Sequence, residues 1–247
     1  MYISFIVLFL LIISVALVYI VETRDSGYQS SPENSTGENV VLIHGILRGS
    51  RSMNKIKREL VSQGYKVTGF DYSPEDGSIE EISDRLHEKI KKFPKGKIHF
   101  VTHSMGAVIV RKYISKYKPR NTGRVVMIAP PNNGSVYAAV LLRLPFFEKI
   151  FGRSGVEIAE GENCILNTLP VPKFEFGVIA GGTGYKIGLN PFLKGDNDGT
   201  VLLNETIIKG MADFMQIKGQ HSFLLFNNEV ISESINFLKN GKFQKKS

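Results

Sequence analysis

The chain has 247 residues, of which 43% are hydrophobic and 22% charged, so it can bury one substantial core, and we expect one main globular domain. Its formal net charge of +8 is not gathered into an arginine-rich stripe with interleaved aromatic residues, which argues against a nucleic-acid-binding protein and suits contact with anionic lipid headgroups. The single cysteine, Cys164, excludes an internal disulfide, no Cys/His cluster has zinc-site spacing, and we expect neither a metal nor a cofactor.

The N-terminal segment is apolar. Residues 2–21 carry no charge and approach the roughly 20 residues that a membrane-spanning helix needs, so residues 1–21 are predicted to form a transmembrane anchor. A cleaved signal peptide is the alternative, although the segment lacks a basic n-region and Ser14-Val15-Ala16 is only a passable cleavage site. Residues 22–38 form a polar linker with one basic residue, Arg24, so we expect a membrane protein whose main domain faces away from the cytoplasm.

From residue 39 to 241, short β-branched runs alternate with amphipathic stretches. This alternation predicts an α/β domain with a mostly parallel sheet of about six strands flanked by helices. Ser78 and Glu81 form a capping box at the start of one of those helices. Strands are expected at 40–43, 66–70, 98–102, 124–129, 174–180 and 214–217, helices at 53–63, 78–90, 106–117 and 227–238, and a basic tail at 242–247.

Residues 136–172 interrupt this alternation after the fourth predicted strand. The segment is rich in aliphatic and aromatic residues between Leu141 and Phe151, and it also contains Pro145 and glycines. We predict a short lid or cap insertion that walls an acyl-binding pocket, with ordinary helical core as an equally weighted alternative. The candidate pocket residues are Leu47, Leu141, Leu144, Phe146 and Phe147.

Ser104 is the candidate nucleophile. Residues 102–106 read Thr-His-Ser-Met-Gly, a degenerate match to the G-x-S-x-G turn in which a serine lies between a strand and a helix. An apolar strand ends just before this segment and a helical pattern follows it, which is the context that the motif requires. The alternative is a strand end that happens to be rich in serine and threonine.

A nucleophilic serine needs a histidine base and a carboxylate that orients the base, in the chain order serine, acid, histidine for this type of turn. His221 is the only histidine after Ser104 in the sequence. Three aspartates lie between them, and we favour Asp198 because it occupies an Asn-Asp-Gly turn after the fifth predicted strand. Asp196 is the second choice, and Asp213 is expected to be an ordinary polar residue of a turn or strand edge.

Two backbone N–H groups are expected to bind the oxyanion: that of Met105, directly after the nucleophile, and that of Ile46, in the loop after the first strand. Gly45 lets that loop turn closely. His44 is expected to be a structural hydrogen-bonding residue rather than a second base.

With these positions assigned, the chain resembles the bacterial α/β-hydrolases of the lipase and esterase family, which are related more distantly to bacterial triacylglycerol lipases. The resemblance implies an α/β-hydrolase fold, a triad of Ser104, Asp198 and His221, and hydrolysis of carboxylic esters, with lipid or acyl esters as substrates. This chain has Asn133 where the family usually has histidine. The resemblance spans residues 39–243 and rests on the segments 44–46, 51–53, 64–65, 102–106, 130–135, 198–199, 210–213 and 221–223.

Three other functions remain open. An acyltransferase or a thioesterase would use the same three residues, and a catalytically silent membrane-bound binding protein is the non-enzyme alternative.

Overall fold

The computed structural model describes residues 37–73, 76–93 and 96–244. In this part of the chain six strands form a single sheet in the order β2-β1-β3-β4-β5-β6, and every neighbouring pair is parallel. The predicted parallel sheet is therefore confirmed, with each strand boundary within two residues of its expected position. The strands are β1 (Asn39–Ile43), β2 (Lys66–Phe70), β3 (Ile98–His103), β4 (Thr122–Ile128), β5 (Phe176–Gly182) and β6 (Asp213–Lys218).

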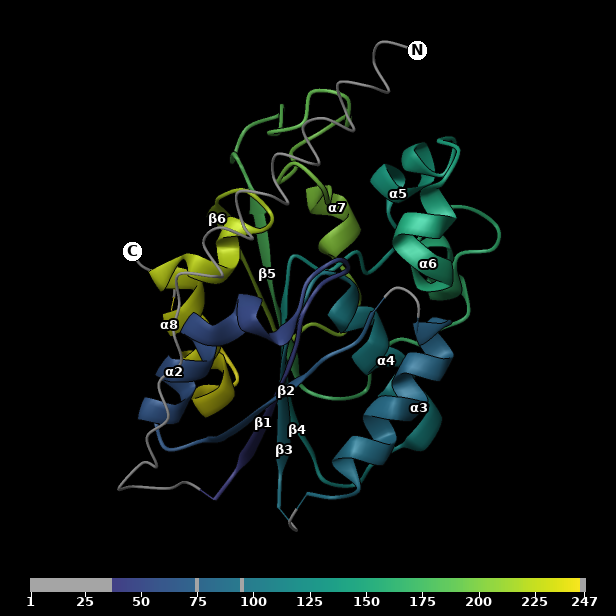
Figure 1. Cartoon of the computed structure of the whole chain (residues 1–247). Coiled ribbons are helices and arrows are strands. Elements are labelled where there is room, and N and C mark those ends of the chain that lie inside the picture. Colours follow the sequence, from purple (N-terminus) through teal and green to yellow (C-terminus); the bar gives the residue numbers. More distant parts are fainter. Residues whose placement is uncertain (1–36, 74–75, 94–95, 245–247) are drawn as a thin grey trace.

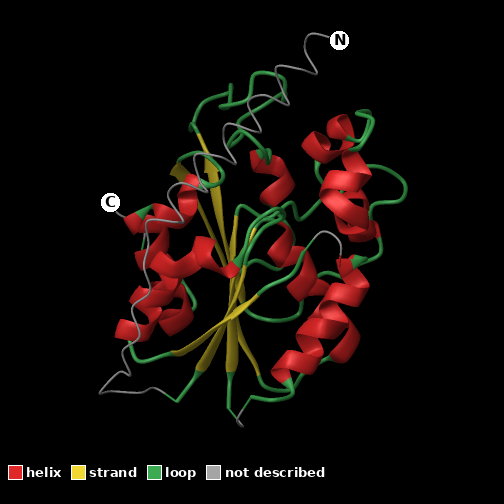
Figure 2. Cartoon of the chain, in the orientation of Figure 1, coloured by secondary structure: helices red, strands yellow, loops and turns green. Residues whose placement is uncertain are grey.

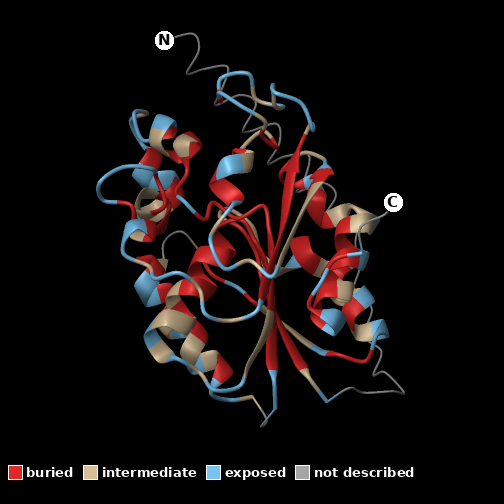
Figure 3. Ribbon diagram, turned by 180° about the vertical axis from the view of Figure 1, so that it is seen from behind, coloured by how far each residue is buried: buried red, intermediate tan, exposed pale blue. Residues whose placement is uncertain are grey.

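Helices cover both faces of the sheet (Figures 1 and 2). The helices α2 (Asn54–Ser62) and α8 (Asn228–Asn240) lie on one face, and α3 (Ile79–Ile90) and α4 (Met105–Tyr117) lie on the other. A parallel sheet covered in this way must be apolar on both sides, which explains the hydrophobic runs at the ends of the inner strands β1 and β4. The edge strands β2 and β6 are more polar and only half-buried. Figure 3 shows that the central strands are the most deeply buried part of the molecule.

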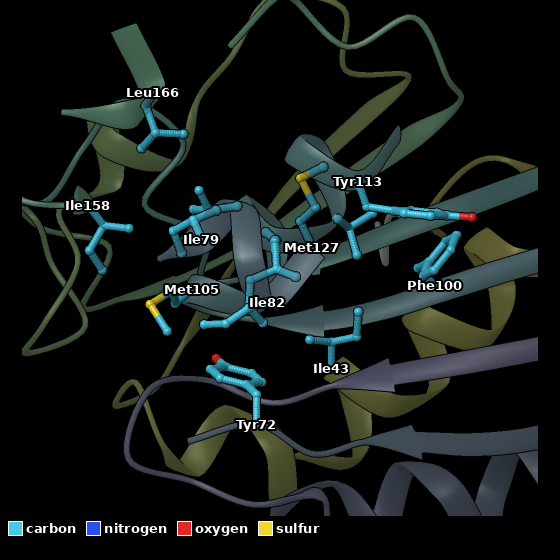
Figure 4. Close-up of a cluster of buried hydrophobic side chains, with 14 of the residues drawn as sticks. Ile43, Tyr72, Ile79, Ile82, Phe100, Met105, Tyr113, Met127, Ile158 and Leu166 are labelled. Atoms are coloured by element: carbon cyan, nitrogen blue, oxygen red, sulfur yellow. The ribbon is translucent and has the colours of Figure 1, made fainter. Parts of the chain in front are cut away.

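Alternate residues of β1 point into two separate hydrophobic cores. Val41 and Ile43 belong to the core beneath α3 and α4, and Val40 and Leu42 belong to the core beneath α2 and α8. Figure 4 shows part of the first core, where Ile43 lies among side chains from the strands and from α3. This period-two alternation fixes the strand register, because a slip of one residue would exchange the two faces.

Local sequence signals explain the main helix boundaries. The predicted capping box is present at α3, where Ser78 Oγ accepts from Glu81 N at 3.2 Å and Glu81 Oε2 accepts from Ser78 N at 2.8 Å. The helix predicted at 53–63 is present as α2, and a 3₁₀ turn, η1 (Ser50–Met53), directly precedes it. The short elements η3 (Ile165–Asn167), α7 (Leu203–Thr206) and η4 (Phe223–Phe226) have too few residues to show a helical period in the sequence.

The predicted insertion at 136–172 contains two helices, α5 (Val136–Leu141) and α6 (Phe147–Glu157), followed by η3. They follow β4 and lie beyond the α3 and α4 layer, near the end of the sheet where the strands finish (Figure 1). We refer to α5 and α6 as the cap helices. Whether they move as a lid remains a prediction.

The two ends of the chain differ in what the structure describes. The predicted anchor at 1–21 lies outside the described residues, and within the described ranges no helix is long and apolar enough to cross a bilayer. At the other end, the predicted basic tail does not begin cleanly at 242. Phe243 is buried and packs on Phe237 with ring centroids 5.0 Å apart, and its N–H donates to Asp213 Oδ2 at 2.9 Å. The domain therefore continues at least to Phe243.

Candidate active site

Ser104 lies at the turn between β3 and α4, where the sequence motif predicts it. Its backbone has φ 52° and ψ −126°, a conformation that residues with a side chain rarely adopt. Ser104 N donates to Ile128 O at 2.9 Å, so the strained turn is attached to the end of the neighbouring strand β4. The side chain is almost buried, with 6% of its residue surface exposed.

Crowding on the helix side of this turn explains the glycine of the motif. A Cβ atom on Gly106 would lie 2.5 Å from Ile43 O and 2.8 Å from His44 O, so any side chain there would push α4 away from β1. The strand side of the turn has room for a larger residue than glycine. Thr102 occupies this position fully buried, and its hydroxyl is satisfied by donating to Val126 O at 3.2 Å. The degenerate motif therefore has a steric basis.

Asp198 and His221 form a buried pair. Asp198 Oδ2 lies 2.7 Å from His221 Nδ1, and His221 N donates to Asp198 O at 2.9 Å. Asp198 Oδ1 accepts from the backbone N–H groups of Thr200 and Val201 at 3.0 and 2.8 Å. These bonds fix the carboxylate, and a carboxylate partner places the imidazole proton on Nδ1, which leaves Nε2 unprotonated in the neutral ring.

The other two aspartates have different partners. Asp196 accepts hydrogen bonds from Thr183 N and Oγ1, from Gly184 N and from Gln216 Nε2, which hold the loop after β5. Burial acts to raise the pKa of Asp196, but these hydrogen bonds outweigh it and lower the pKa below its usual value. Asp213 begins β6, at the opposite end of the strand from the loop that carries His221. The structure therefore brings Asp198, and neither alternative, to His221.

The loop after β1 is held by His44. The His44 ring stacks on Tyr72 at 4.3 Å, its Nε2 accepts from Tyr72 N at 3.3 Å, and its Nδ1 therefore donates to Gly45 O at 2.8 Å. The peptide that begins with this carbonyl ends with the N–H of Ile46, so the histidine fixes the plane of that N–H. Burial lowers the pKa of His44, consistent with a neutral, structural ring rather than a second base.

The two expected oxyanion donors occupy different environments. Ile46 lines the pocket described below, and Met105 is fully buried as the first residue of α4. The first N–H groups of a helix have no partner within the helix, so the N–H of Met105 points out of the N-terminus of α4.

His103 was not singled out in the sequence, although it precedes Ser104 directly. Its Nε2 donates to His221 O at 3.1 Å, and the two rings lie 4.7 Å apart. Burial, followed by the nearby charges of His221 and Arg48, lowers the pKa of His103 well below its usual value. His103 is therefore a neutral residue that holds the backbone of His221.

One pocket brings together Ser104, His221 and the cap helices. It encloses about 90 Å³, which is small beside the 300–1,000 Å³ typical of sites for drug-sized ligands. Its apolar wall comes mainly from the cap helices and the loop after β1. The lining residues are Gly45, Ile46, Leu47, Arg48, His103, Ser104, Pro131, Ser135, Tyr137, Ala138, Leu141, Phe147, Phe151, Gly155, Ile158, Thr200, Val201, His221 and Ser222.

Three of the five candidate pocket residues, Leu47, Leu141 and Phe147, line this pocket, and Leu144 and Phe146 do not. Phe146 has φ 84° at the start of α6, and 71% of its surface is exposed to solvent. Leu144 packs instead at the edge of the core beneath α3 and α4. The apolar pattern identified the segment, but it could not separate pocket residues from a turn or from the core.

The segment at 130–135 anchors the cap helices, and its Pro131 and Ser135 also line the pocket. The Nδ2 atom of Asn133 donates to Asn204 O at 3.2 Å and to Ile207 O at 2.7 Å. Arg111 Nη1 donates to the carbonyl and the side chain of Asn132. Ser135 caps α5 by accepting from Ala138 N at 3.1 Å. These contacts join the base of the cap helices to α4 and α7.

Glu205 is a residue of α7, and its buried carboxylate faces the start of the cap helix α5. Its Oε1 accepts from Val136 N at 2.7 Å and its Oε2 accepts from Leu202 N at 2.9 Å. Burial raises the pKa of Glu205, the two backbone hydrogen bonds oppose that effect, and the nearby Asp198 and Glu160 add to the rise, giving about 7. The charge of this residue therefore changes near neutral pH.

Glu205→Gln is expected to remove a pH dependence of stability. The folded pKa is about 7 and the ordinary value is 4.5, so between these values the folded state holds a proton that the unfolded state has lost. Wild-type stability from this group therefore falls as pH rises, and relative to the variant the loss between about pH 5 and pH 8 should be about 2 kcal/mol. Urea unfolding of both proteins at each pH measures it, and parallel pH profiles would contradict the assignment.

Comparison with known proteins agrees with this architecture. A model of the family described as serine aminopeptidase, S33, matches residues 34–167, more than half of the chain. The lysosomal thioesterase PPT2 homolog of Drosophila melanogaster is 29% identical in an alignment of length 140 that covers 49% of this chain and 48% of that protein. The chain therefore spans about half the length of that relative.

Several solved structures share the fold. The mature lipase BlEst2 of Bacillus licheniformis superposes with a TM-score of 0.63 at 18% identity, over 87% of this chain and 96% of that one. The carboxylesterase CesB of Bacillus subtilis gives 0.56 at 11% identity over 93% and 98%, and the phospholipase PlaB of Legionella pneumophila gives 0.62 at 16% over 83% and 57%. The fold is that of the α/β-hydrolases, and the chain belongs to the serine aminopeptidase S33 family of hydrolases.

Proposed function

We propose that this protein is a serine hydrolase that cleaves carboxylic esters through an acyl-enzyme, with Ser104 as nucleophile, His221 as base and Asp198 as the acid that orients it. The observation that carries the proposal is the pocket itself. Ser104, on a strained turn, and His221, hydrogen-bonded to a buried aspartate at 2.7 Å, line the same mainly apolar cavity. A nucleophile, a base and an orienting acid are the parts that acyl transfer requires.

The reaction has two steps. Ser104 Oγ attacks the ester carbonyl while His221 Nε2 takes its proton, and the bond to the leaving alcohol breaks as His221 returns that proton to the alcohol oxygen. Water then attacks the acyl-enzyme with the same histidine as base, releasing the carboxylic acid and restoring the serine. The N–H groups of Ile46 and Met105 are the proposed oxyanion donors, and His44 positions the first of them.

The lining of the pocket indicates the acyl group. Leu141, Phe147 and Phe151 of the cap helices form an apolar wall next to Ser104, which suits a hydrocarbon chain rather than a peptide or a sugar. A cavity of about 90 Å³ holds only a short chain in this arrangement, so longer acyl groups require displacement of the cap helices. We propose further that the substrates are lipid esters in a membrane, where the predicted anchor would hold the domain.

A thioester is the second candidate substrate. The Drosophila relative is named as a thioesterase. The same nucleophile, base and oxyanion donors would cleave a thioester, because only the leaving atom differs. Matched butyryl oxygen esters and thioesters with the same leaving-group skeleton separate the two substrate classes by kcat/KM.

A fluorophosphonate probe tests the proposed chemistry directly. It should label the purified wild-type protein on Ser104, with labelling abolished in Ser104→Ala, because only an activated serine reacts quickly with such a probe. The labelled peptide is identified by mass spectrometry, and a panel of p-nitrophenyl esters of increasing chain length gives turnover. Absence of both labelling and turnover would favour the binding-protein alternative, and transfer to an added alcohol in place of hydrolysis would indicate an acyltransferase.

A further inference from the structure

Two segments of the chain expose large hydrophobic side chains. One is formed by the cap helices and the turn between them, and the other is the segment of residues 183–195 after β5, which we call the β5 loop. Figures 1 and 3 show both segments at the end of the molecule where β5 finishes. The exposed side chains are Val140, Leu142, Phe146 and Ile150 of the cap and Tyr185, Ile187, Leu189 and Phe192 of the β5 loop, each with at least 38% of its surface exposed.

Hydrogen bonds hold the β5 loop beside the pocket. Leu189 N donates to Asn197 O at 3.1 Å, and Asn190 N donates to Asn197 Oδ1 at 2.8 Å. Asn197 directly precedes Asp198, in the turn that continues to the pocket-lining residues 200 and 201. The cap helices line the same pocket from other elements of the fold. Both apolar segments therefore adjoin the pocket.

The β5 loop has a buried side and an exposed side. Leu193 is 5% exposed and belongs to the core beneath α3 and α4, whereas its neighbour Phe192 is 49% exposed. The loop therefore already contributes a side chain to the core. Single exposed apolar residues are ordinary on protein surfaces, but a group of them in one segment indicates an interaction site.

The charges in these two segments are mainly positive. The β5 loop contains the exposed Lys186 and Lys194 and no acidic residue, and the carboxylate of Asp196, directly after it, is occupied by the hydrogen bonds described above. Apolar side chains interleaved with cations suit an anionic bilayer, because the cations meet lipid phosphates while the apolar groups enter the acyl boundary. A second copy of this face would bring like charges together, which disfavours self-association. Residues 140–150 of the cap contain two cations and one acid, namely Arg143, Lys149 and Glu148.

We propose that the β5 loop and the cap helices form a membrane-docking face, which inserts its exposed apolar side chains into an anionic lipid bilayer and presents the pocket to lipid substrates. The inference rests on the proposed function for what enters the pocket, and it adds the surface that meets the membrane. Docking lets an acyl chain pass from the bilayer to Ser104 with little exposure to water. The predicted anchor would tether the domain, and the docking face would set its orientation.

Tryptophan fluorescence tests the docking face, because the chain contains no tryptophan. Phe192→Trp and Phe146→Trp each add one reporter to the proposed face, and neither position lines the pocket. Val171→Trp is the matched control. Val171 is 48% exposed, but it lines a groove with Lys118 at the C-terminal end of α4, whereas Ser104 precedes the N-terminal end of that helix.

The full chain is incorporated into vesicles of phosphatidylcholine and phosphatidylglycerol that carry bromine-labelled acyl chains, which quench tryptophan on contact. The reporters of Phe192→Trp and Phe146→Trp should be quenched and should emit at shorter wavelength, and the reporter of Val171→Trp should show neither change. Quenching should be weaker in vesicles of phosphatidylcholine alone. Lys186→Gln with Lys194→Gln should lower the quenching of Phe192→Trp in anionic vesicles towards that weaker level, and Lys173→Gln should not.

Turnover of a membrane-borne substrate gives a second measurement. Ile187→Asp with Phe192→Asp should lower hydrolysis of a long-chain ester carried in the same vesicles by about 10-fold or more, because two apolar side chains would no longer enter the bilayer. Hydrolysis of a water-soluble butyryl ester should fall by much less, since neither residue lines the pocket. Val171→Asp should leave hydrolysis of the vesicle-borne ester at the wild-type level.

The outcomes are distinguishable. Equal quenching at all three reporter positions, or quenching at none, would overturn the docking face. A shift to shorter wavelength that grows with protein concentration but needs no brominated lipid would also overturn it, because a second copy of the chain would then cover the face. The fluorescence test needs no catalysis and can be repeated in Ser104→Ala. Loss of quenching in a protein that still reacts with the fluorophosphonate probe would therefore remove the docking face alone, and quenching without probe labelling or ester turnover would remove the proposed function alone.

Discussion

Ser104→Ala is expected to lower kcat for the proposed ester hydrolysis by about 10⁴-fold or more. Only the proposed nucleophile is removed, and the remaining site would supply little more than substrate binding and oxyanion stabilisation. The fold should be retained. Alanine keeps the same Cβ atom, so the strain at φ 52° is the same in both proteins. His221→Ala should cause a similar loss, since an unactivated serine hydroxyl is a poor nucleophile.

The double variant Ser104→Ala/His221→Ala provides the sharper test. Residues that act as a unit are not additive, so the double variant should be no slower than the more damaged single variant by more than a few-fold. Ser115→Ala, on α4 but away from the pocket, controls for general effects of losing a serine hydroxyl. Thermal unfolding should give closely similar midpoints for Ser104→Ala and wild type. Near-normal turnover in either single variant would refute the assignment.

Local patterns made much of the fold predictable. The apolar runs at the ends of β1 and β4 need no information beyond their own residues, because a strand covered on both faces must be largely continuous in hydrophobicity. The capping box at Ser78 similarly places the start of α3 to the residue. Ser104 was predictable for the same reason, since the strand, the turn and the helix that position it are adjacent in sequence.

Contacts between distant parts of the chain were not predictable. Arg48 and Ser222 are 174 residues apart, and no sequence motif around either residue predicts the hydrogen bond between them. Arg48 directly follows the candidate pocket residue Leu47, and Ser222 directly follows His221, and this adjacency was the available signal. The raised pKa of Glu205 was harder to predict, because it depends on burial and on a hydrogen bond from the N–H of Val136, 69 residues earlier. Neither the burial of this side chain nor its contact with Val136 can be derived from the sequence.

The sequence favoured Asp198 for three reasons: its Asn-Asp-Gly turn, its place after the fifth predicted strand and the family resemblance. The structure makes that choice testable by substitution. Asp198→Asn should lower kcat by about 10⁴-fold, by analogy with the same substitution in serine proteases. The asparagine Nδ2 would face His221 Nδ1, where the carboxylate now lies at 2.7 Å. Because an amide N–H₂ cannot accept, the imidazole proton would move to Nε2 and the ring could no longer take the proton of Ser104.

Asp196→Asn is the matched control, two residues away in the same loop and identical in the atoms exchanged. Its carboxylate accepts from Thr183, Gly184 and Gln216, so the amide should weaken the loop after β5 and lower the unfolding temperature. Its kcat should nevertheless stay within about 10-fold of wild type, because the Asp198 and His221 pair is intact. Steady-state kinetics of both variants with one p-nitrophenyl ester decide the matter. If Asp196→Asn proves the more damaging to kcat while both proteins remain folded, the orienting acid is Asp196, and the 2.7 Å contact of Asp198 is structural.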